Sequence, residues 1–305
     1  MNRRRPKIGL VLGSGAARGW SHIGVIRALQ EENIVPDLVC GCSIGAFVGA
    51  AYAAGELARL ETWVSRLTWQ DVLGLLDISW RSGLIKGERL MQFFRQEAPD
   101  RQFKDLATPF AAVATDLETG HEAWLREGNL ARAVRASLAM PGLFTPVPHD
   151  NGFYVDGGLV NPVPVSLARA LGADIVIAVD LGSDMIGRAF RREGLEPVSA
   201  EQSEAARNAR LLTRLWFSRT DNGAAGQVSL PSLMSVMTSS INIMQVRIAR
   251  SRLAGEPADV LITPRLAQLG LMDYHRAQEA IAEGRAAVRR MLPALEHALG
   301  RERSK

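Results

Sequence analysis

Apolar and polar positions along the first third of the chain predict alternating strands and helices. A strand is expected over 7–12, a glycine-rich loop over 13–19 and a helix over 20–32, where Ile23, Ile26 and Leu29 recur at helical spacing. A second apolar strand over 36–40 and a helix of small residues over 44–54 repeat the unit. A strand followed twice by a helix indicates parallel strands that are covered by helices.

The rest of the chain continues this alternation. The segment 56–98 reads as mostly helical, and 187–226 is polar and rich in arginine. The remaining predicted strands are 109–115, 122–125, 153–155, 174–181 and 259–263, and the remaining helices are 129–140, 162–171, 232–253 and 274–299. We therefore expect an α/β fold of three layers, with a mainly parallel central sheet covered by helices on both faces. One domain is expected over 1–305, with a motif-bearing core over 7–181 and a C-terminal helical extension with one strand over 182–305.

Composition excludes several classes of protein. The 305 residues are 47% hydrophobic and 22% charged, which excludes global disorder. A net charge of +4 is too small to suggest nucleic-acid binding, and the basic run from Arg3 to Lys7 reads as a solvated tail with a weak attraction for anionic membranes. Cys40 and Cys42 cannot make a disulfide framework. No secretion signal is evident, so a cytoplasmic protein, peripheral at the inner membrane surface, is expected.

A serine nucleophile is indicated by Gly41-Cys42-Ser43-Ile44-Gly45, which matches G-x-S-x-G. The pattern places a serine on a strained turn between a strand and a helix, and here an apolar strand precedes it and a small-residue helix follows. The alternative is a serine in an ordinary tight turn.

The partner of this serine is not a histidine in any familiar order. Only His275 and His297 follow the plausible aspartates, and both fall in the predicted C-terminal helical region. Asp156, by contrast, ends a predicted strand and precedes Gly157 and Gly158. It is either a site carboxylate or a cap of the next turn.

The first glycine-rich loop is suited to an oxyanion hole. The stretch 13–17 offers several backbone N–H groups at the start of a helix, and Arg18 adds positive charge. A dinucleotide-binding loop is the competing interpretation, but Arg18 stands where its third glycine would be, and no acidic residue ends the second strand. No metal or cofactor is expected.

With these blocks in hand, the sequence resembles the patatin-like phospholipase family, in particular its bacterial subgroup related to neuropathy target esterase. The resemblance covers the glycine-rich block with Arg18 and Gly19, the stretch 22–25, Gly-x-Ser-x-Gly at Ser43, the stretch 137–141 and Asp156-Gly157-Gly158. It implies a Ser-Asp dyad with Ser43 as nucleophile and Asp156 as base. It further implies an oxyanion hole of backbone amides at Ser14, Gly15 and Ala16. The expected supporting residues are Arg18, Gly19, Gly41, Gly45, Gly157 and Gly158.

The resemblance implies a serine lipid acyl hydrolase that acts on phospholipids or lysophospholipids. Ser14 and Ala16 stand where the family usually has glycines, but both are small. An acyltransferase using the same serine and a lipid-binding regulator with little turnover remain alternatives. The stretch 137–144 is either a wall of the site or a helix-ending loop. Arginines interleaved with apolar residues over 207–219 fit either a membrane-interface helix or a helix packed on the domain.

Overall fold

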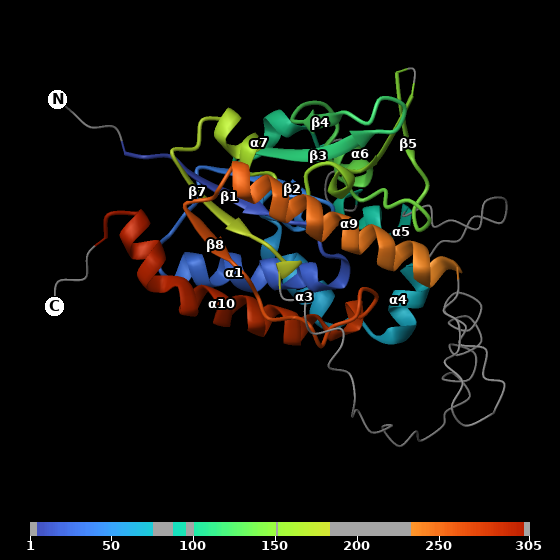
Figure 1. Ribbon diagram of the computed structural model, residues 1–305. Helices are drawn as coiled ribbons and strands as arrows, with labels where there is room; N and C mark the ends of the chain where they lie inside the picture. The colour runs from blue at the N-terminus through green and yellow to red at the C-terminus, as the bar shows by residue number, and fades with distance from the viewer. Residues whose placement is uncertain (1–4, 76–87, 96–100, 151, 184–232, 302–305) are drawn as a thin grey trace, which may run out of the picture.

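A central sheet organises the molecule (Figure 1). The computed structural model describes residues 5–75, 88–95, 101–150, 152–183 and 233–301. Within them the strands run in the order β5-β6-β3-β2-β1-β7-β8, and β4 pairs with β3 off this path. The strands are β1 (Ile8–Leu12), β2 (Leu38–Cys42), β3 (Phe110–Asp116), β4 (Glu122–Leu125), β5 (Val147–His149), β6 (Gly152–Asp156), β7 (Ile175–Val179) and β8 (Val260–Ile262).

The sheet has a parallel part and an antiparallel edge. β1 lies in the middle, parallel to β2 and β7, and these are parallel to β3 and β8 respectively. β3 is antiparallel to β4 and β6, and β6 is antiparallel to β5. The expected α/β fold with a mainly parallel sheet is confirmed, since four of the seven pairings are parallel. β5 was not predicted.

Helices cover both faces of this sheet. They are α1 (Ser21–Glu31), α2 (Ile44–Ala53), α3 (Leu57–Ser65), α4 (Trp69–Leu75), α5 (Glu88–Arg95), α6 (Leu130–Ser137), α7 (Val165–Ala170), α9 (Leu233–Gly255) and α10 (Ala277–Ala298). Short 3-10 turns are η1 (Ala16–Trp20), η2 (Phe103–Asp105), η3 (Gly157–Leu159) and η6 (Tyr274–Arg276).

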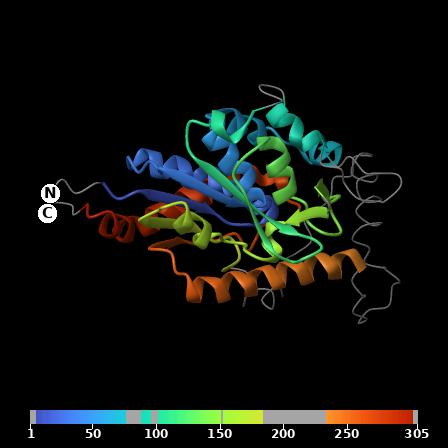
Figure 2. The same ribbon diagram turned by 90° about the horizontal axis from the view of Figure 1, so that it is seen from above.

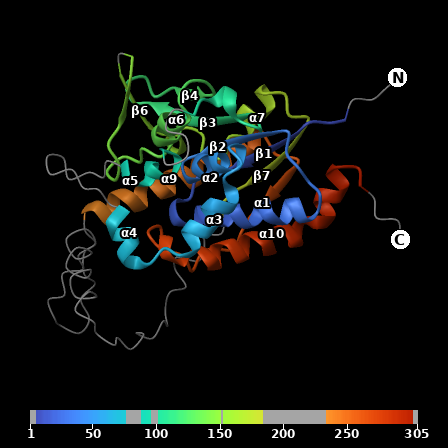
Figure 3. The same cartoon turned by 180° about the vertical axis from the view of Figure 1, so that it is seen from behind.

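Alternate residues of the central strand belong to different cores. Leu10 and Leu12 of β1 pack in one cluster with side chains of α1, α2 and α10, whereas Val11 packs in a second cluster with side chains of α7 and α9. This is the period of two that a strand buried on both faces requires. Seen from above, α9 forms an outer layer along one side of the sheet (Figure 2), and from behind α1, α3 and α10 are in view (Figure 3).

The first and last helices touch through their backbones. A Cβ atom on Gly24 of α1 would lie 1.9 Å from the carbonyl oxygen of Ile281, and one on Gly284 of α10 would lie 2.0 Å from that of Ser21. Only glycine allows this approach. The predicted C-terminal extension therefore contributes α10 to the layer over α1, and it contributes β8 to the sheet.

Most predicted elements occur with ends shifted by a few residues. The mostly helical segment 56–98 contains α3, α4 and α5, while the arginine-rich stretch 207–219 lies outside the described residues. Among the helices that the structure describes, none is long and apolar enough to cross a membrane. The strand expected over 36–40 and the helix expected over 44–54 are present as β2 and α2.

Candidate active site

Ser43 lies on the sharp turn between β2 and α2. Its backbone has φ 56° and ψ −124°, in the left-handed region that side chains other than glycine rarely adopt. The carbonyl oxygen of Ser43 accepts hydrogen bonds from the amides of Ala46 and Phe47, which begin the helix. The strained turn that the G-x-S-x-G pattern predicts is present.

The two glycines of the pattern are required by contacts of the backbone. A Cβ on Gly41 would lie 2.5 Å from the Cα of Ala46, and one on Gly45 would lie 2.0 Å from the carbonyl oxygen of Leu12. Real Cβ atoms do not approach so closely. α2 therefore begins directly against the end of β1, where the glycine-rich loop starts.

The Ser43 hydroxyl and the Asp156 carboxylate are in direct contact. Ser43 Oγ donates to Asp156 Oδ2 across 2.6 Å, and both residues are buried. Asp156 Oδ1 accepts from the amide of Gly158 at 2.7 Å. Asp156 thus both caps the next turn and accepts a hydrogen bond from the serine. The two interpretations that the sequence left open, a site carboxylate and a turn cap, therefore both apply.

The backbone around Asp156 is held from several sides. Its amide donates to the carbonyl oxygen of Ala139, and its own carbonyl oxygen accepts from Thr115 Oγ1 at 2.8 Å. Gly157 is needed because a Cβ there would lie 2.2 Å from the carbonyl oxygen of Val113. Burial raises the pKa of Asp156 to about 6, while the hydrogen bonds from Ser43 and Gly158 oppose the rise. The carboxylate is therefore a stronger base than a free aspartate.

Ser137 holds the backbone of the turn at Ser43 through hydrogen bonds. Its hydroxyl accepts a hydrogen bond from the amide of Ser43 at 2.9 Å and donates to the carbonyl oxygen of Val113 at 2.6 Å. Ser137 is fully buried at the end of α6. The sequence indicated only a wall or a loop here, and no local pattern marks this contact, which spans 94 positions.

The glycine-rich loop lies beside the turn of Ser43. Gly19 packs against Ile44, since a Cβ on Gly19 would lie 2.2 Å from the Ile44 side chain. Ser14 differs from the expectation for an oxyanion donor, because its amide already donates to the carbonyl oxygen of Pro162 at 2.9 Å. None of the described residues accepts a hydrogen bond from the amides of Gly15 or Ala16, and Ala16 has φ 51°.

His22, to which no sequence motif assigned a role, supports this loop. Its Nε2 lies 2.8 Å from the carbonyl oxygen of Gly13. Burial lowers the pKa of His22 to about 4, although the hydrogen bond to Gly13 opposes this. A neutral imidazole that donates from Nε2 fixes the start of the loop. Across the described parts of the chain, no histidine forms a hydrogen bond with Ser43 or Asp156.

Arg18 is buried and points toward α9. One guanidinium nitrogen donates to the carbonyl oxygen of Leu181 at 3.4 Å and another to Asn242 Oδ1 at 3.2 Å. Burial lowers the pKa of Arg18 to about 10, which leaves it charged at neutral pH, and nearby Asp180 opposes the decrease. Arg18 therefore links the glycine-rich loop to α9.

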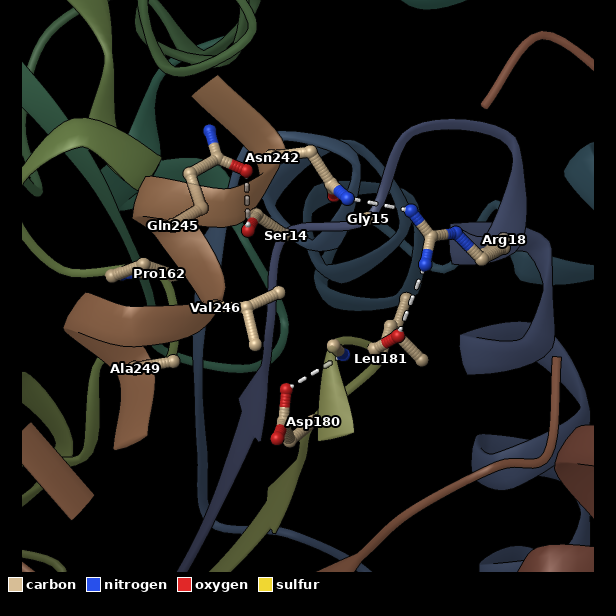
Figure 4. A pocket seen from close by; sticks show the side chains of 11 residues that line it. Ser14, Gly15, Arg18, Pro162, Asp180, Leu181, Asn242, Gln245, Val246 and Ala249 are labelled. Carbon is tan, nitrogen blue, oxygen red and sulfur yellow. Dashed lines mark hydrogen bonds between the residues drawn. The ribbon is translucent and has the colours of Figure 1, made fainter. Parts of the chain in front are cut away.

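A small pocket lies between the glycine-rich loop, the end of β7 and α9, and neither Ser43 nor Asp156 lines it (Figure 4). In it, Ser14 Oγ donates to Gln245 Oε1 at 3.3 Å. The other end of the Gln245 amide, Nε2, has no partner among the described residues, and a Cβ on Gly158 would lie 2.4 Å from it. Gln245, which the sequence did not single out, thus lies between the loop and the turn after Asp156.

The described residues hold no group of three histidine, cysteine, aspartate or glutamate side chains that could bind a metal ion. The functional groups that the site does bring together are a hydroxyl, a carboxylate with raised pKa and backbone amides. This set is suited to acyl transfer through a serine.

Comparison with known proteins shows which family this chain is similar to. The patatin-like phospholipase family matches residues 10–169. An uncharacterized NTE family protein of Mycobacterium tuberculosis is 34% identical over 333 residues, covering 95% of this chain and 92% of that protein. Patatin-like phospholipase domain-containing protein 6 of Homo sapiens is 39% identical over 185 residues, covering 58% of this chain and 13% of that protein.

Among solved structures, that of VipD from Legionella pneumophila aligns with 95% of this chain and 67% of its own, at a TM-score of 0.47 and 14% identity. The family match extends from β1 to α7 and therefore includes the turn of Ser43 and the strand of Asp156. Both the family and the relatives support a lipid hydrolase function. The chain belongs to the patatin-like phospholipase family.

Proposed function

We propose that this protein is a serine lipid acyl hydrolase that cleaves carboxylic esters of phospholipids or lysophospholipids through a Ser43-Asp156 dyad. The observation that carries the proposal is the 2.6 Å hydrogen bond from Ser43 Oγ to Asp156 Oδ2, formed by a serine on a strained turn. Family membership supplies the substrate class.

In the first step Asp156 acts as a general base. Ser43 Oγ attacks the ester carbonyl carbon while its proton passes to Asp156 Oδ2. The tetrahedral intermediate then collapses, the bond to the leaving alcohol breaks, and that alcohol takes the proton from Asp156. The product of this step is an ester between Ser43 and the acyl chain.

In the second step water replaces the alcohol. A water molecule attacks the acyl-enzyme carbonyl and gives its proton to Asp156, and Ser43 Oγ recovers that proton as the fatty acid leaves. A pKa of about 6 leaves Asp156 mostly ionised at neutral pH and makes it a better proton acceptor than a free carboxylate. The dyad therefore needs no histidine.

The amides of Gly15 and Ala16 are the donors that we propose for the oxyanion. The two ends of the loop that carries them pack against the start of α2, because Gly13 approaches Gly45 and Gly19 approaches Ile44. Backbone donors that are fixed before the reaction stabilise the developing negative charge without reorganising. The charge of Arg18, two residues further along, adds to this field.

The test is hydrolysis of p-nitrophenyl esters from short to long acyl chains, followed by phospholipids and lysophospholipids, by the native protein and by Ser43→Ala. Circular dichroism and thermal melting establish that both proteins are folded. Activity in the native protein alone supports the proposal, and added acceptor alcohols show whether water or an alcohol takes the acyl group. A folded native protein that is inactive on every ester would refute it.

A further inference from the structure

α9 carries large apolar side chains on its exposed side as well as on its buried side. Its inner side, which includes Gln245 and Val246, is buried against the glycine-rich loop and the end of β7. Its outer side exposes four large apolar side chains, with exposed fractions of 45% for Val236, 40% for Met237, 59% for Ile243 and 50% for Met244. A spacing of seven relates Val236 to Ile243 and Met237 to Met244, so the four share one face of the helix.

The charge on α9 has a single sign. The helix contains Arg247, Arg250 and Arg252 and no acidic residue. Arg252 pairs with Glu122 of β4 at 3.0 Å, whereas Arg247 and Arg250 are exposed. The outer face is therefore apolar in its first half and cationic in its second half.

The apolar half lies at the catalytic edge of the sheet. α9 leads into β8, which is parallel to β7, so α9 runs back against these strands and begins near the edge at which they end. Ser43 follows β2 at the same edge. The contacts of Asn242 with Arg18 and of Gln245 with Ser14 tie this part of α9 to the site (Figure 4).

Four other large apolar side chains are exposed among the described residues, and they do not all lie at this edge. Leu117 follows β3 and Phe153 pairs beside it, so both lie toward the edge at which β3 ends. Trp124 lies on β4, where it pairs with Val113 in the middle of β3, and Val35, which precedes β2, lies at the opposite edge. Apolar side chains grouped at one end of a molecule mark an interaction site more often than scattered ones do.

We propose that the outer face of α9 docks on a lipid bilayer that contains anionic lipids. Its apolar half enters the boundary between head groups and acyl chains, and Arg247 and Arg250 lie at the level of the phosphates. The single sign of charge selects an anionic surface, and the aliphatic side chains suit acyl chains. This inference rests on the proposed function, because it places the dyad where its lipid substrates are found.

The experiment measures binding separately from catalysis. Ser43→Ala is the parent protein, and its co-sedimentation is measured with phosphatidylcholine vesicles and with vesicles that also contain phosphatidylglycerol. Ile243→Ser combined with Met244→Ser is expected to lower the partition coefficient by about tenfold or more. Arg247→Glu combined with Arg250→Glu is expected to lower the partition coefficient by about fivefold or more per residue, and only on the anionic vesicles. The same variant is expected to make vesicle binding less dependent on salt.

Val35→Ser is the matched control, because Val35 is as exposed as Ile243 but lies at the other edge of the sheet. Circular dichroism verifies that all variants are folded. The proposal is overturned if the parent does not bind the anionic vesicles, or if the Ile243/Met244 variant binds as well as Val35→Ser. If the parent self-associates but does not bind vesicles, and the Ile243/Met244 variant no longer self-associates, the face would be assigned to a second copy of the chain instead. Because the parent lacks the Ser43 hydroxyl, these binding results do not depend on whether the native protein hydrolyses esters.

Discussion

The amide of Ser43 donates to the hydroxyl of Ser137 at 2.9 Å, so α6 holds the backbone of the nucleophile. The same hydroxyl donates to the carbonyl oxygen of Val113, which lies on β3 beside β2. One side chain thus joins a helix, a strand and the strained turn. The position of the hydroxyl of Ser43 depends on this bridge.

Replacing Ser137 by alanine is expected to lower kcat by about tenfold with a smaller change in KM, because a misplaced nucleophile slows the chemical step. It is also expected to lower the free energy of unfolding by about 1–3 kcal/mol, since two buried backbone groups lose their partner. Ester kinetics and urea unfolding measure the two effects. Thr62→Ala removes an exposed hydroxyl that also bonds a backbone carbonyl, and it serves as the control. An unchanged kcat would show that the bridge does not position the nucleophile.

The activity should depend on pH through Asp156. Only the ionised carboxylate accepts the proton of Ser43, and its pKa is about 6. We expect kcat/KM for an uncharged ester to rise with pH below about 6 and to level off above it. A profile without a change between pH 5 and 7 would argue against Asp156 as the base.

The same carboxylate makes the stability depend on pH. Burial raises the pKa of Asp156 from 3.8 to about 6, so folding favours its protonated form, and stability is lost as the pH rises from about 4 through 6. The loss is about 3 kcal/mol. Asp156→Asn lacks this loss, because the side-chain amide can donate to Ser43 Oγ while its oxygen accepts from Gly158.

We therefore expect Asp156→Asn to abolish turnover. The difference in free energy of unfolding, variant minus native protein, is expected to increase by about 3 kcal/mol from pH 4 to pH 7. Urea unfolding at several pH values measures this difference. A difference that stays constant over this range would contradict the assigned pKa.

Gly45→Ala is expected to destabilise the protein by about 3 kcal/mol or more and to abolish activity, because its Cβ would lie 2.0 Å from the carbonyl oxygen of Leu12. Gly255→Ala is the control, since a Cβ there meets nothing within 4 Å. Thermal melting of both variants tests this. Equal melting temperatures would mean that the start of α2 can move away from β1.

The sequence was most informative where structure is local. The turn at Ser43 could be predicted because its glycines, its strand and its helix lie within a few positions of one another. The strand β5 could not be predicted, because Val147–His149 is only three residues long and contains Pro148. Proline argues against a central strand, and β5 is an edge strand of the sheet.

Contacts between distant segments account for the rest of the site. The pairing of Ser43 with Asp156 was expected only through resemblance to a family, since 113 positions separate them. Ser14 was expected to donate its amide to an oxyanion, but Pro162, which no local pattern places there, accepts that hydrogen bond. The approach of Gln245 to Ser14 spans 231 positions and leaves no trace in the spacing of either segment.

The backbone contact between α1 and α10, made where Gly24 meets Ile281 and Gly284 meets Ser21, has a consequence for synthesis of the protein on the ribosome. α1 leaves the exit tunnel well before its partner α10, because 245 residues (32–276) lie between the two helices. A nascent chain that has not reached Gly284 exposes the face of α1 that α10 covers, and η1 and the glycine-rich loop precede that helix directly. α1 thus reaches its final packing only after α10 has been synthesised, and until then its apolar face is available to chaperones.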